Sequence, residues 1–99
     1  MIFEVLQRTG LPVVYSHSKK GKAPPYLAYI GSGQEQFKAD DTRYHHYNTY
    51  QVEYYFTKKN EELEDKIEET LLDGGFFFEK SEDTYLEDEG VFLIYYFVN

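Results

Sequence analysis

The chain has 99 residues, with 10 lysines and arginines against 18 aspartates and glutamates, which gives a formal charge of −8. It is long enough for one small domain, residues 1–99, and because it has no cysteine we exclude disulfide scaffolds, cysteine-ligated metals and thiol nucleophiles. The sequence contains neither an apolar run of membrane-spanning length nor a signal-type segment, so we expect a soluble protein that is not exported.

The first elements are a short helix and a strand. Apolar side chains recur at helical spacing before Gly10, which predicts an amphipathic helix over residues 2–9. The β-prone run 11–16 predicts a strand, and Pro12 suits the start of a strand or a sheet edge. Lysines, glycine and prolines over 17–25 then predict a loop.

The middle of the chain predicts two strands and a polar arm. Residues 26–30 predict a strand, which the Gly-Ser-Gly run 31–33 interrupts or bends. The alternating run 43–57 predicts a strand whose even-numbered side chains turn inward from Tyr50 onward. Because this strand is unusually long, we expect its first half to project beyond the main sheet and to pair with the polar segment 34–41.

A second helix follows Asn60, which is placed to cap it, with acidic residues in the first turn where the helix dipole favours them. Leu63, Ile67 and Leu71 recur every four residues, and the glycine pair 74–75 ends the helix.

The last third predicts strands. Residues 76–80 predict one strand, a polar link follows at 81–84, and 85–87 lead into a turn at 88–90. The run 91–98 is apolar on both faces, so it belongs inside the sheet, or has one face covered by a helix and the other by a partner subunit. The order of elements predicts an α+β domain: an antiparallel or mixed β-sheet with a long projecting hairpin and two helices packed on one face.

Charge is unevenly distributed along the chain. Residues 1–60 hold 8 basic and 5 acidic groups, for +3, whereas residues 61–99 hold 2 basic and 13 acidic groups, for −11. An acidic surface repels phosphate backbones, so we expect no tight nucleic-acid binding. The alternative is that the acids keep a domain rich in tyrosine and phenylalanine soluble.

Only one grouping suggests chemistry, namely His45 and His46 together with His17, Asp40 and Asp41. Neighbouring strand residues point to opposite faces, so the two adjacent histidines cannot both bind one ion without a bulge. Nor does a nucleophile or carboxylate stand at a spacing that orients either imidazole. We therefore expect no enzyme, no metal site and no cofactor.

Four segments, in this order, resemble a family of small proteins encoded by siphophages and prophages of Gram-positive bacteria. They are 11–17 (LPVVYSH), 23–33 (APPYLAYIGSG), 48–59 (NTYQVEYYFTKK) and 78–83 (FEKSED). Family members usually lie among head-to-tail joining genes, just before the major tail protein, and the order of elements is similar to that of tail terminator (tail completion) proteins. The resemblance spans nearly the whole chain.

The resemblance implies a structural virion protein at the head–tail junction, made in the bacterial host cytoplasm. It implies a ring, commonly of six subunits, that caps the tail tube, stops its polymerisation and docks the head connector. The expected partners are other copies of the chain, the major tail tube protein and the head connector or stopper protein, with no membrane.

Three groups of residues are candidates for this role. The interface arm, for contacts with the tube or a neighbour, comprises Gln34, Glu35, Gln36, Phe37, Lys38, Asp40, Asp41 and Arg43. The basic loop, for contact with the acidic helix of a neighbouring subunit, comprises Lys19, Lys20 and Lys22. The acidic lumen, past which DNA slides, comprises Glu61, Glu62, Asp65, Glu69, Glu82, Asp83, Glu87 and Glu89.

Two other readings stay open. One is a different head–tail connector component, a stopper or adaptor, which binds the portal side instead of the tube. The other is a monomeric regulator that uses its acidic face as a decoy for a basic partner.

Overall fold

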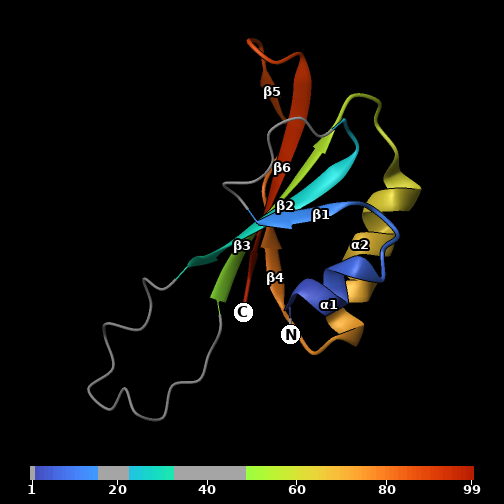
Figure 1. Cartoon of the computed structure of the whole chain (residues 1–99), viewed down its shortest axis with the longest axis vertical. Helices are drawn as coiled ribbons and strands as arrows, with labels where there is room; N and C mark the ends of the chain where they lie inside the picture. The colour runs from blue at the N-terminus through green and yellow to red at the C-terminus, as the bar shows by residue number, and fades with distance from the viewer. Residues whose placement is uncertain (1, 16–22, 33–48) are drawn as a thin grey trace.

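The structure is a computed structural model that describes residues 2–15, 23–32 and 49–99. Two helices and six strands follow one another along these residues (Figure 1). They are α1 (Ile2–Gln7), β1 (Val13–Tyr15), β2 (Tyr26–Ser32), β3 (Thr49–Phe56), α2 (Glu61–Asp73), β4 (Phe78–Lys80), β5 (Thr84–Leu86) and β6 (Val91–Val98). The predicted α+β class is confirmed. The predicted projecting hairpin and its polar segment 34–41 lie outside the described residues.

The strands form one mixed sheet in the order β1-β2-β3-β6. The far side of β6 is shared by two short strands: β4 pairs with its C-terminal half and β5 with its N-terminal half. All pairs are antiparallel except β1–β2, in which Val13 lies opposite Leu27. Residues 16–25 connect these two strands. This connection is longer than the tight hairpin turn that would make the two strands antiparallel. Pro12 directly precedes the edge strand β1, and its carbonyl accepts a hydrogen bond from the Leu27 amide at 2.9 Å.

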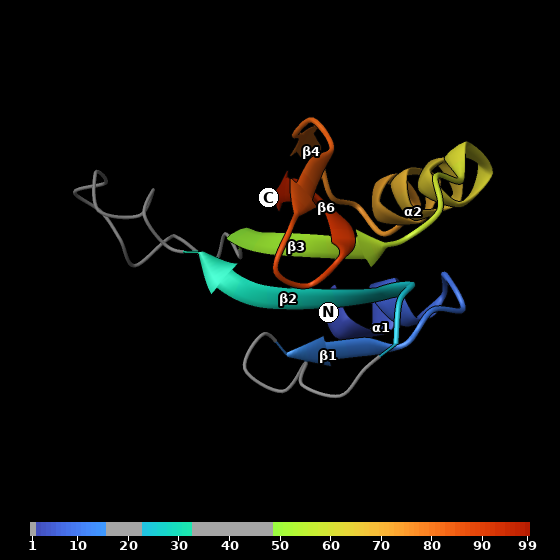
Figure 2. The same ribbon diagram turned by 90° about the horizontal axis from the view of Figure 1, so that it is seen from above.

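Both helices lie on one face of the sheet, as the two views show (Figures 1 and 2). The Asn60 side chain caps α2 by accepting a hydrogen bond from the Leu63 amide at 3.1 Å. Ile67 and Leu71 of α2 are fully buried against the even-numbered side chains of β3, as their spacing predicts. At the end of α2, a Cβ on Gly74 would lie 2.7 Å from Val5 of α1, so the absence of a side chain lets the two helices meet.

Several predicted boundaries were wrong. The strand predicted over 11–16 starts only at Val13, the one predicted to residue 57 ends at Phe56, and the segment predicted over 85–87 is Thr84–Leu86. Three other differences have a clear local reason. The first helix ends at Gln7, because the next residues form a turn closed by the Gly10 amide on the Gln7 carbonyl. Residue 31 does not interrupt β2, which continues to Ser32 because β3 supplies partners for it. Strand β4 begins at Phe78 rather than residue 76, because the Phe76 amide bonds the Leu71 carbonyl and so closes the end of α2.

The helix-free face of the sheet carries a second apolar cluster. Tyr26, Ala28, Tyr55 and Leu93 are buried there, and the rings of Tyr26 and Tyr55 stack with centroids 4.7 Å apart. Strand β6 therefore lies in the sheet interior with apolar contacts on both faces, as its sequence predicts. No helix in the described part of the chain is long and apolar enough to cross a membrane.

Candidate functional site

Two of the three predicted groups cannot be placed. The arm residues 34–43 and the basic-loop residues Lys19, Lys20 and Lys22 lie outside the described residues, as do the three histidines. Within the described ranges, no group of three or more His, Cys, Asp or Glu side chains is arranged to hold a metal.

The acidic-lumen residues are all exposed, in two separate places. Glu61, Glu62, Asp65 and Glu69 lie on the outer face of α2, since the helical repeat that buries Ile67 turns these positions toward solvent. None of these four has a hydrogen-bond or ion-pair partner among the described residues. The other four lie in the β4–β5 link and the β5–β6 turn: Glu82, Asp83, Glu87 and Glu89. Of these, Asp83 is ion-paired with Lys59 at 3.1 Å.

Two further acids of α2 turn toward the sheet and are neutralised. Lys80 Nζ on β4 lies 3.0 Å from Glu64 Oε1 and 2.7 Å from Glu68 Oε2. Lys59 Nζ, just before the helix, lies 2.8 Å from Glu64 Oε2. The Glu64 side chain is only 3% exposed, so these contacts compensate a charge that burial alone disfavours.

Tyr96 extends this network into the core, since its hydroxyl donates a hydrogen bond to Glu68 Oε2 at 2.9 Å. Burial and this hydrogen bond raise the pKa of Tyr96. Contact with Glu64 raises the pKa of Lys59. Partial burial acts to lower the pKa of Lys80, but its contacts with Glu68 and Glu64 prevail and raise it. The result is an ion network that joins α2 to β4 and β6.

This network was not among the predicted site residues. The two acids are one helical turn apart and next to the apolar stripe, so they could have been assigned to the inner face. The lysine that pairs with both acids could not have been identified from the sequence, because Lys80 lies near them only as a result of the pairing of β4 with β6.

A buried carboxylate also lies on the helix-free face. Glu53 accepts hydrogen bonds from the Tyr55 hydroxyl at 2.7 Å and from the Gln51 side chain at 3.1 Å. Burial, followed by this hydrogen bond, raises the pKa of Tyr55. The alternation of β3 places all three side chains on one face, but no pattern in the sequence indicates that this face is buried. With these hydrogen bonds to a neighbouring tyrosine and amide, Glu53 belongs to a packed polar cluster.

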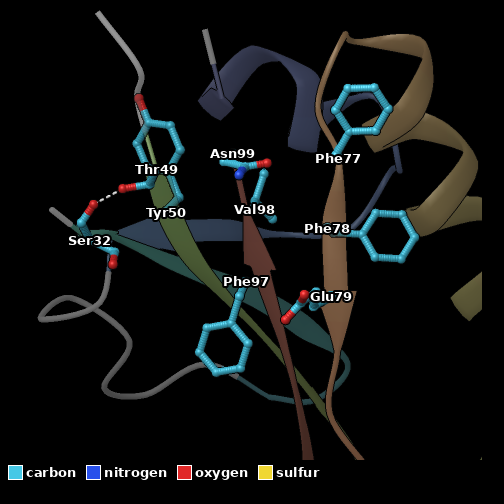
Figure 3. A pocket seen from close by; sticks show the side chains of 9 residues that line it. All are labelled: Ser32, Thr49, Tyr50, Phe77, Phe78, Glu79, Phe97, Val98 and Asn99. Atoms are coloured by element: carbon cyan, nitrogen blue, oxygen red, sulfur yellow. Dashed lines mark hydrogen bonds between the residues drawn. The ribbon is translucent and has the colours of Figure 1, made fainter. Parts of the chain in front are cut away.

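One end of the sheet has an open pocket of about 440 Å³ (Figure 3). The ends of β2 and β3 lie at one side of it, where Thr49 donates a hydrogen bond to the Ser32 carbonyl, and Phe77 and Phe78 lie at the other. Two of its lining rings are unusually exposed, Phe77 at 72% and Phe97 at 47%. The predicted arm, residues 34–43, lies in sequence between Ser32 and Thr49, and both of these residues line this aromatic pocket.

The described side chains thus form an acidic outer surface, an internal ion network and an aromatic pocket. No family model, no curated protein and no solved structure matches this chain.

Proposed function

We propose that this chain is a structural virion protein that caps the phage tail tube as a ring and joins the tail to the head connector. The resemblance of four ordered segments to small head–tail joining proteins supports the proposal. The structural observation that carries it is the division of the acids of α2 into two sets. The inner pair, Glu64 and Glu68, is neutralised by lysines, whereas the outer acids have no described partner; these are Glu61, Glu62, Asp65, Glu69 and Asp73.

An unpaired acidic face suits a channel through which DNA must slide. Like charges on the wall and the phosphate backbone keep the two surfaces apart, which prevents the tight binding that would stop DNA movement. The inner acids cannot serve this purpose, because ion pairs with Lys59 and Lys80 neutralise their charge. The face of α2 that carries Glu61, Glu62, Asp65 and Glu69 is therefore our proposed lumen surface.

The aromatic pocket is our proposed contact for the tube or for a neighbouring subunit. Exposed phenylalanines such as Phe77 and Phe97 are costly in water and typical of protein interfaces. The pocket that they line also includes Ser32 and Thr49, which flank the segment that contains the predicted arm. We therefore assign the pocket and the arm to the same contact surface.

Charge reversal on α2 tests the lumen assignment. We expect particles carrying Glu62→Lys, Asp65→Lys and Glu69→Lys to assemble normally but to release DNA at least about tenfold more slowly, because the basic wall holds phosphates. The rate should recover as salt rises and screens the charges. The measurement is the time course of DNA ejection from purified particles.

A matched variant reverses three exposed acids that lie outside α2: Glu4→Lys, Glu79→Lys and Asp88→Lys. It carries the same net charge and should eject DNA at the wild-type rate. Equal slowing in both variants would show that total charge matters and that α2 does not face the channel.

A further inference from the structure

Two buried oxygen atoms at the junction of β3 and α2 have unmet hydrogen-bonding capacity. The Tyr54 side chain is fully buried, with its ring stacked on Phe56 at 4.9 Å, and its hydroxyl has no hydrogen-bond partner among the described residues. Glu64 Oε2 is likewise buried and lacks a hydrogen bond there. Its ion pair with Lys59 Nζ at 2.8 Å leaves this carboxylate oxygen with a lone pair that can accept a further hydrogen bond.

The Tyr54 hydroxyl and Glu64 Oε2 lie in the same region of the structure. Tyr54 and Lys59 line the same pocket, of about 250 Å³, between the end of β3 and the start of α2. Burial and then the charge of Glu64 raise the pKa of Tyr54 to about 12, while Lys59 acts to lower it. The hydroxyl, the carboxylate and the ammonium group therefore interact electrostatically, beside a pocket that gives solvent a route to them.

Leaving such groups unpaired is unfavourable, since a buried hydroxyl or carboxylate oxygen loses its bonds to water on folding. Native proteins satisfy nearly all such atoms, often with an ordered water molecule. The charges around the two oxygens decide which kind of ligand could form the missing hydrogen bonds. An anion is repelled by Glu64, and a metal cation must displace two ammonium groups that already contact this carboxylate.

We propose that the junction of β3 and α2 contains a specific hydration site, in which one water molecule accepts a hydrogen bond from the Tyr54 hydroxyl and donates one to Glu64 Oε2. Water is a neutral group that is both a donor and an acceptor, as the two oxygens require. It links the central strand β3 to the ion network of α2. This inference does not depend on the proposed role in the virion.

The sign of one stability change tests the site. A hydroxyl bonded to water stabilises the fold, so Tyr54→Phe should reduce the equilibrium constant for folding about fivefold; an unpaired buried hydroxyl destabilises it, so the same change would increase that constant. Tyr96→Phe is the benchmark, because it removes a hydroxyl with a direct bond to Glu68. Both constants come from urea unfolding at neutral pH.

Location of the water is tested independently, by a high-resolution crystal structure or by magnetisation transfer from water to the Tyr54 hydroxyl in NMR spectra. We expect density, or transfer, from a water molecule between Tyr54 and Glu64. Stability of Tyr54→Phe equal to or above that of the wild type would overturn the proposal. A direct bond from Tyr54 to a protein acceptor, with no water between, would overturn it as well.

Discussion

Replacing Leu71 with alanine is expected to lower the free energy of unfolding by about 3 kcal/mol. Leu71 is fully buried in the main core, where α2 packs on the sheet and against α1. Removing most of its side chain costs the burial of apolar surface and leaves a cavity that neighbouring elements cannot fully close. Urea unfolding followed by circular dichroism measures the change.

The next residue provides a matched control. Leu72 has the same side chain on the same helix but is 51% exposed, so Leu72→Ala should cost less than about 1 kcal/mol. Similar losses for the two variants would contradict the packing of α2 described above.

Raising the pH above 10 is expected to destabilise the protein steeply. Burial raises the pKa of Tyr54 from its ordinary value of 10.0 to about 12, and burial with hydrogen bonds to carboxylates raises the pKa values of Tyr55 and Tyr96. A group whose pKa is higher in the folded state stabilises the fold fully below its unfolded pKa, and this stabilisation is lost as pH rises through the folded value. For Tyr54 alone, the difference corresponds to about 3 kcal/mol.

The urea midpoint at pH 8, 10 and 11.5 measures this dependence, with phenolate absorbance reporting the tyrosines. We expect little change up to about pH 9.5 and a fall above pH 10. Because Tyr96→Phe removes one of the titrating groups, its stability should depend less on pH in the alkaline range. A wild-type midpoint that stays constant to pH 11.5 would show that these hydroxyls are not held protonated by the fold.

Local patterns predicted the elements whose signals lie close together in the chain. Helix α2 combines the Asn60 cap, a repeat of four ending at Leu71 and a glycine pair, and it was predicted at its observed bounds. The run 91–98 was predicted to lie inside the sheet or to be covered on both faces, because it consists of aliphatic and aromatic residues, and the first alternative is the one observed.

Features set by distant pairing could not be predicted. The sequence does not show that β4 and β5 both pair with the same side of β6. This arrangement places Lys80 of β4 next to Glu64 of α2. The burial of Glu53 depends on a second cluster contributed by β2, β3 and β6. The arm over 34–43 and the basic loop at Lys19–Lys22 remain predictions, as does the ring itself.

The central claim is that copies of this chain cap a tail tube, and the most direct measurement is solution mass at moderate salt, alone and with the major tail tube protein of the same genome. Tube lengths followed by electron microscopy in the same mixtures show whether growth stops. We expect a ring-sized oligomer, or tubes whose growth stops on addition of the protein. A monomer that leaves tube length unchanged would contradict the account; its binding to the portal complex would then indicate a connector, and binding to neither would favour the acidic decoy.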